Sequence, residues 1–116
     1  MQQSTFVTSK LHGPAVIVRV EREKVGEHEA PVIQNEVAAA ASPHGWRVAM
    51  DLSMVTLLAS AGLGALITLN KQCKAGGGRL ALFGISEDIL AVMKLTRLHT
   101  LLTISADRDA AVKAVS

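Results

Sequence analysis

The sequence lacks the residues that disulfide frameworks, zinc sites and base-stacking surfaces require. Cys73 is the single cysteine in 116 residues, and the four histidines are scattered without ligand-like spacing, so neither an internal disulfide nor a metal site is expected. Aromatic residues make up 3% of the chain and tyrosine is absent, which argues against stacking of nucleic-acid bases. No apolar run reaches the ~20 residues of a membrane span. These absences predict a cytoplasmic protein without a bound metal or cofactor.

The sequence also has no large excess of one charge. Twelve basic residues against ten acidic ones leave a formal charge of +2, and the nearest approach to a basic cluster is Lys71, Lys74 and Arg79, around the expected end of a helix, where cations are favoured anyway. Direct nucleic-acid binding is therefore not expected. The length and the 49% apolar content suit one domain, residues 1–116, with a packed core.

Hydrophobic periodicity predicts strands that alternate with helices. His12-Gly13-Pro14 is turn chemistry between two alternating segments, which predicts a hairpin. Val48, Ala49 and Met50 lie in a run with almost no polar alternation, which is typical of a strand buried on both faces of a parallel sheet. The expected strands are Thr5–Leu11, Ala15–Glu21, Trp46–Leu52, Arg79–Phe83 and Leu101–Ile104.

Helix signals fall between and after these strands. Ser60 and Ser86 are expected to cap helices, and Gly76-Gly77-Gly78 is expected to close the first of them. The expected helices are residues 27–41, 60–75, a segment that begins after Ser86, and 107–115, with a loop over 53–59. The order β-β-α-β-α-β-α-β-α predicts an α/β fold with a mostly parallel or mixed five-stranded sheet and about four helices.

The stretch from Asp51 to Leu66, DLSMVTLLASAGLGAL, carries most of the functional information. A buried strand leads through a short apolar loop to Ser60, whose hydroxyl we expect at the start of a helix with unpaired amides. Gly62 and Gly64 are expected to clear side chains from the surface beside that hydroxyl, so that a partner's backbone or a nucleotide phosphate can approach closely. The alternative is that these glycines serve only tight packing of the helix. The carboxyl ends of parallel strands, where this loop must lie, form the usual binding edge of open α/β sheets.

This stretch resembles the signature of STAS domains in anti-sigma factor antagonists, commonly D-L-S-x-V-x-F-(I/L)-D-S-S/A-G-L-G-x-L. The resemblance continues in the glycine-rich turn and strand over residues 75–86 and in the helix end over 92–98, and it extends from about Val16 to the C-terminus. It implies a STAS fold and a non-enzymatic function in binding a protein partner.

In the antagonist family the anti-sigma factor is itself a kinase that phosphorylates the first serine of this motif, the position of Ser60. The resemblance therefore implies a partner switch that regulates transcription. The unmodified protein binds the anti-sigma factor serine kinase and frees the sigma factor, the phosphorylated protein is released, and a phosphoserine phosphatase is a further possible partner. A charged loop, Lys24 to Glu29 here, is implied beside the phosphoacceptor. The partner-binding residues implied by the motif are Ser53, Met54, Thr56, Ala59, Ala61, Gly62, Leu63 and Gly64.

One position departs from the family pattern. The aspartate that usually precedes the phosphoacceptor is Ala59 here, which leaves open a second reading as a non-switching STAS subunit of a lipid-transport or stressosome-type assembly. A third reading, an enzyme with Ser60 as nucleophile, lacks a histidine or second acid placed to activate the hydroxyl. Asp51 is expected to bond loop amides rather than to act as a base or a metal ligand.

Overall fold

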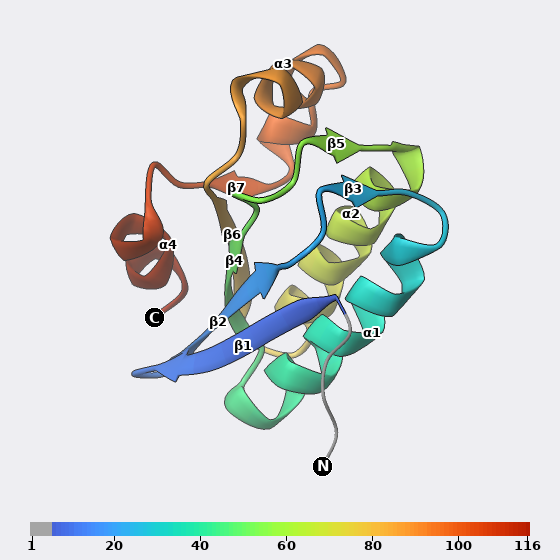
Figure 1. The fold of residues 1–116 in the computed structure, drawn as a ribbon. Helices are drawn as coiled ribbons and strands as arrows, with labels where there is room; N and C mark the ends of the chain where they lie inside the picture. The colour runs from blue at the N-terminus through green and yellow to red at the C-terminus, as the bar shows by residue number, and fades with distance from the viewer. Residues whose placement is uncertain (1–5) are drawn as a thin grey trace.

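The segments before and after the Gly13-Pro14 turn form a hairpin that continues into a mixed five-stranded sheet (Figure 1). The computed structural model describes residues 6–116, so Thr5 of the first expected strand lies outside the described residues. Strand order is β1-β2-β4-β6-β7; β1 pairs antiparallel with β2 and the other neighbours pair parallel. The strands are β1 Val7–His12, β2 Ala15–Val20, β4 Arg47–Asp51, β6 Arg79–Phe83 and β7 Thr103–Ile104.

Within residues 6–116, four α-helices cover the two faces of this sheet and one end of it. They are α1 Glu29–Ala41, α2 Ser60–Ala75, α3 Glu87–Leu95 and α4 Arg108–Val115, with short 3-10 helices at Ser42–His44 and Leu98–Thr100. Figure 1 shows α1 and α2 side by side on one face, α4 on the other, and α3 at the end of the molecule next to the segment that precedes α2. The predicted α/β fold with a mixed five-stranded sheet is confirmed.

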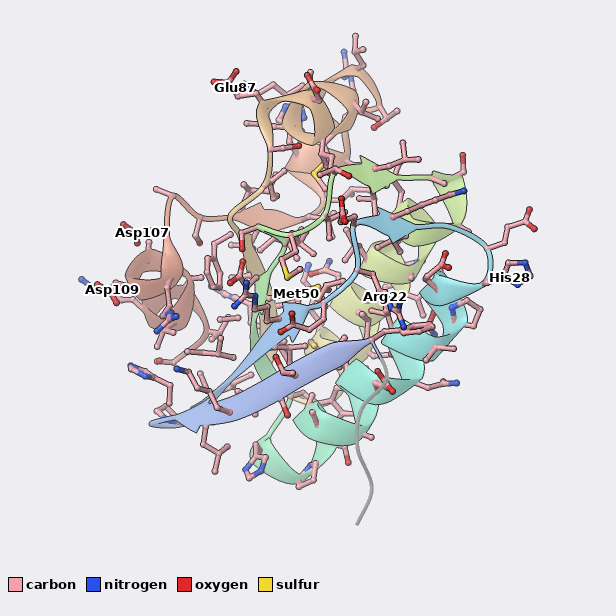
Figure 2. The ribbon with its side chains drawn as sticks, viewed as in Figure 1. Arg22, His28, Met50, Glu87, Asp107 and Asp109 are labelled. Atoms are coloured by element: carbon pink, nitrogen blue, oxygen red, sulfur yellow. The ribbon has the colours of Figure 1, made fainter. Side chains whose placement is uncertain are left out.

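Alternation along the strands divides the core into two layers. Val18, Met50 and Leu82 are fully buried on the face covered by α1 and α2, and Met50 lies in the middle of the molecule (Figure 2). Their neighbours Ile17, Ala49 and Ala81 pack against α4 instead. The small alanine side chains let α4 lie close to the sheet, since successive residues of a strand point to opposite faces.

Capping residues predicted from the sequence lie at the helix ends, except at the start of α2. The Ser86 hydroxyl accepts a hydrogen bond from the Ile89 amide (3.2 Å), which confirms Ser86 as the cap of α3. At the start of α4 the Asp107 carboxylate accepts from the Ala110 amide (2.9 Å). Gly76 is the C-cap of α2, and Gly77 takes a left-handed φ of 87° that favours glycine. The glycine triplet is therefore a helix end and turn, as expected.

Cys73 of α2 is fully buried in the core. Burial raises the pKa of its thiol to about 11, because the thiolate would lose its hydration. The thiol is therefore protonated at neutral pH and behaves as a small apolar side chain.

Two negative findings hold for residues 6–116. Within this range no helix is both long enough and apolar enough to cross a bilayer. The same residues contain no cluster of three or more histidine, cysteine, aspartate or glutamate side chains arranged to hold a metal ion.

Candidate functional site

The approach to the candidate site begins at the carboxyl end of β4. There the Asp51 carboxylate accepts a hydrogen bond from the Ser53 amide (2.9 Å), so it fixes the first turn of the loop that leaves the strand. This bond to a loop amide is of the kind expected for Asp51. Gly84, at the end of β6, packs against the same carboxylate: a Cβ there would lie 2.9 Å from Asp51 Oδ1, and φ is 72°.

Residues 53–59, expected to be only a loop, include a short strand. β5 (Leu57–Leu58) pairs parallel with β3 (Lys24–Val25) in a separate two-stranded sheet. The Thr56 and Leu57 amides both donate to the Glu23 carbonyl oxygen (2.7 and 3.0 Å), and the Ala59 amide donates to Val25 O (3.0 Å). This ladder places the charged Lys24–Glu29 segment beside the start of α2, where the family resemblance implied a charged loop.

Ser60 is the first residue of α2 and not its cap. Ala59 takes the N-cap position with an extended backbone (φ −77°, ψ 173°), and its methyl group offers no side-chain hydrogen bond. The prediction that Ser60 caps the helix is therefore wrong by one residue. Ser60 is exposed, and among the described residues no hydrogen bond involves its hydroxyl. The hydroxyl is thus available to an external group.

The backbone around Ser60 favours an anion. The first bond of the helical pattern runs from the Leu63 amide to Ala59 O (3.0 Å), so the amides of Ser60, Ala61 and Gly62 precede the intrahelical ladder. No acidic residue occupies the first turn of α2, although acids are common there because they complement the helix dipole. A phosphate attached to Ser60 would lie against unneutralised partial positive charge.

Gly62 and Gly64 have different roles, although both were expected to clear the surface. Gly62 is buried, and a Cβ there would lie 2.6 Å from Leu58 Cδ1 and 2.9 Å from the Val25 carbonyl oxygen. That expectation is wrong for Gly62, because the space above it is filled by β3 and β5. Gly64 is exposed, and nothing lies within 4 Å of its ideal Cβ position, so Gly64 alone leaves the surface open.

The remaining motif residues differ in accessibility. Ser53 and Thr56 are exposed, whereas Met54, Ala61 and Leu63 are half-buried. The Thr56 hydroxyl donates to Glu23 O (3.2 Å), which strengthens the link between the two segments. Thr56 therefore lies beside residue 23 on the way to α2, whereas Ser53 lies at the end of β4, next to Gly84.

Glu29 stabilises the neighbouring segment. Its Oε1 accepts a hydrogen bond from the Gly26 amide (2.9 Å), and this bond is the main reason that the pKa of Glu29 lies below its ordinary value. The turn before α1, next to the start of α2, is thereby closed by a carboxylate.

Residues of α3 near this site were not expected to be functional. Four apolar residues in this helix, Ile89, Leu90, Val92 and Met93, would share a buried face by periodicity, but only Ile89 and Met93 are buried; Leu90 is half-buried and Val92 is exposed. The sequence of α3 does indicate an exposed apolar surface, because its nine residues include more large apolar side chains than one buried face can hold. Val92 is opposite Leu57 of β5 across a small hollow.

Comparison with known proteins agrees with this architecture. The family model for the STAS domain matches residues 7–111, and the chain belongs to the STAS domain family. TM1081 of Thermotoga maritima has a TM-score of 0.81 at 23% identity, over 94% of this chain and 93% of that one. An anti-sigma factor antagonist from Mycobacterium paratuberculosis also has a TM-score of 0.81, at 20% identity and with 94% and 92% covered.

A more distant likeness is to the Bacillus cell fate determinant SpoIIAA in its phosphorylated form. Its TM-score is 0.68 at 14% identity, with 93% of this chain and 98% of that one covered. These structures share the fold with the present chain.

Proposed function

We propose that this protein is an anti-sigma factor antagonist, which binds an anti-sigma factor kinase in the cytoplasm and is released when the kinase phosphorylates Ser60. The observation that carries the proposal is the exposed Ser60 hydroxyl in the first turn of α2, beside amides that precede the intrahelical ladder. Membership of the STAS family and the likeness to anti-sigma factor antagonists support it.

The chemistry of the switch follows from two opposite effects of one phosphate. Phosphorylation adds about −1.5 to −2 charges, which the helix start tolerates because its amides and dipole favour an anion. A partner surface fitted to a neutral hydroxyl would face or bury an unpaired dianion, at a cost of several kcal/mol. The fold is therefore retained while the complex dissociates.

The proposal is tested by phosphorylation of the wild type and of Ser60→Ala by the anti-sigma factor kinase encoded in the same genome, with ATP. We expect one phosphate on Ser60 of the wild type and none on the variant. Circular dichroism should show both proteins folded, since Ser60 is exposed and its hydroxyl has no partner among the described residues. A phosphate that maps to another residue, or that persists in Ser60→Ala, would exclude the site.

Binding gives a second test of the same proposal. Ser60→Asp should weaken the complex with the kinase by at least roughly tenfold, about 1.4 kcal/mol, measured by isothermal titration calorimetry in the presence of ADP. Ser9→Asp is the control, because it adds the same charge at an exposed position of the edge strand β1, outside the proposed interface. Equal affinity of Ser60→Asp and wild type would contradict electrostatic release.

Ala59 favours a second candidate, a STAS subunit of a lipid-transport or stressosome-type assembly that does not switch. The family's aspartate at this position would place a carboxylate next to the phosphoacceptor hydroxyl, and Ala59 supplies none. Under this candidate the protein would copurify with a transporter ATPase or a stressosome core, and the kinase assay above would leave Ser60 unmodified.

A further inference from the structure

A small apolar hollow lies beside Ser60, between the segment that precedes α2 and the exposed side of α3. Its volume is about 100 Å³. Thr56, Leu57 and Leu58 form one wall, Leu63 of α2 contributes to it, and Asp88, Ile89 and Val92 of α3 complete the lining. Figure 1 shows β5 and α3 next to each other at one end of the molecule.

The walls of the hollow continue into apolar surface that nothing in the described chain covers. Leu57 is 52% exposed and Val92 is 43% exposed, although both line the hollow. Leu95, three residues beyond Val92 on α3, is 85% exposed. Residues three and four apart share a helix face, so Asp88, Val92 and Leu95 form one stripe along α3.

The size of the hollow limits what can occupy it. Small-molecule sites commonly measure about 300–1,000 Å³, so a space of about 100 Å³ is too small for a nucleotide or a cofactor. It is large enough for one aliphatic side chain. Pockets of this kind, filled by a single anchor residue and surrounded by apolar contacts, dominate the affinity of many protein interfaces.

Charge indicates which kind of protein segment fits. Asp88 borders the hollow, and its neighbour Glu87 also lies in the first turn of α3. Figure 2 shows Glu87 at the surface. On the other side of the start of α2, residues 23–29 contain three glutamates and one lysine. The segments 23–29 and 87–88 together hold four more acidic than basic residues, whereas the whole chain carries a formal charge of +2. A partner that covers these segments must present basic groups to avoid like-charge contact.

We infer that the hollow between β5 and α3 is the docking pocket for one aliphatic side chain of the anti-sigma factor, carried on a segment with a lysine or arginine that faces Asp88. The inference rests on the proposed function and deepens it, since Leu57, Leu58 and Leu63 lie within three residues of Ser60. A partner surface that covers the phosphoacceptor therefore reaches the hollow as well. The anchor supplies affinity, and Ser60 supplies the switch.

The apolar part of the inference is tested with Leu57→Ser and a matched control, Leu11→Ser. Both leucines lie on strands at the molecular surface and are similarly exposed, 52% and 58%, but Leu11 is on β1. Calorimetric titration uses the anti-sigma factor kinase encoded in the same genome, with ADP. We expect Leu57→Ser to weaken binding by at least about tenfold, in the range of an anchor residue, and Leu11→Ser to bind like the wild type. Val92→Ser provides a second variant on the opposite wall.

The charged part is tested with Asp88→Lys against Asp109→Lys. Each aspartate is exposed and occupies the second position of its helix, after the caps Ser86 and Asp107, so the two substitutions disturb the helix dipole alike. We expect Asp88→Lys to weaken binding about fivefold or more and to reduce its dependence on salt, as loss of a complementary charge pair does. Asp109→Lys should change neither.

The outcomes separate the inference from the function on which it rests. If the wild type binds the kinase, and Leu57→Ser and Val92→Ser bind equally well, the hollow is not the docking pocket while the proposed function stands. If the wild type binds no anti-sigma factor kinase, the proposed function fails and the inference fails with it. Sedimentation of the wild type as a dimer that Leu57→Ser dissociates would assign the hollow to a second copy of this chain and would also overturn the inference.

Discussion

The starts of α2 and α3 can be compared directly, because Ala59 (φ −77°, ψ 173°) and Ser86 (φ −65°, ψ 156°) hold the N-cap position in the same extended region. Ser86 accepts a hydrogen bond from the Ile89 amide, and Glu87 and Asp88 follow it in the first turn. At Ala59 there is no cap bond, and no acid follows. The start of α3 thus has a side-chain cap and acidic residues of its own, and the start of α2 has neither.

The start of α4 follows the pattern of α3. Asp107 caps it, and Asp109 lies in its first turn; Figure 2 shows both at the surface on the side of the molecule formed by α4. A helix start without its own anion loses stability that a cap would provide. The exception at α2 agrees with the proposal that Ser60 accepts a phosphate.

The largest expected effect concerns the packing behind the open helix start. Gly62→Ala should destabilise the protein by about 1–3 kcal/mol, the usual cost of overpacking, because the new methyl group would meet Leu58 and the backbone of Val25. Gly64→Ala is the matched control, and it should stabilise the protein by about 0.5–1 kcal/mol through helix propensity, since its Cβ meets nothing. Urea denaturation measures both. Equal effects at the two positions would mean that β3 and β5 do not hold the start of α2.

The two serines should respond differently to the same substitution. Ser86→Ala should lower the free energy of unfolding by about 1 kcal/mol, since it removes a cap, whereas Ser60→Ala should change it by less than about 0.5 kcal/mol, as for other exposed positions. Denaturant titration of the two variants side by side decides the matter. A comparable loss at Ser60 would show that its hydroxyl is used within the fold and would break the contrast between the helix starts.

Closing the open start should stabilise the protein. Ala59→Asp should raise the free energy of unfolding by about 0.5–1 kcal/mol, because the carboxylate can accept a bond from an amide of the first turn. Thermal denaturation of the variant and the wild type measures this gain. An unchanged melting temperature would indicate that these amides already have partners.

The smallest effect concerns the turn before α1. The bond from the Gly26 amide lowers the pKa of Glu29 in the folded protein, so ionised Glu29 contributes stability above its ordinary pKa of 4.5, and this contribution is lost as the pH falls through the lower, folded value. The difference in unfolding free energy between the wild type and Glu29→Gln should therefore shrink toward acid pH. A difference that stays constant from neutral to acid pH would contradict the assignment.

The strands and helices could be predicted because burial imposes a pattern on the sequence. Val16, Val18 and Val20 pack on one face of the sheet, and Ile17 between them packs on the other. The run Val48 to Met50 has no polar residue. Ser86 and Gly76 mark helix ends. The β3–β5 ladder could not be predicted, since strands of two residues are too short to show a period. Its bonds join residues more than thirty positions apart.

The details of the site depend on this unpredicted ladder. Because β3 lies over Gly62, that glycine serves packing rather than an open surface. The position of Ser60 was predicted within one residue, but whether Ala59 or Ser60 holds the cap depends on a single pair of backbone angles. The exposure of Val92 depends on how α3 lies against the rest of the protein, which the periodicity of α3 alone does not fix.

The β3–β5 ladder also bears on the folding and opening of the molecule. Its two residue pairs join distant parts of the sequence through few hydrogen bonds, and of the four residues Val25 alone is fully buried. Contacts of high sequence separation and little burial form late and open early. Local opening of this ladder would loosen the backbone on both sides of Ala59 and Ser60 while the five-stranded sheet stays intact.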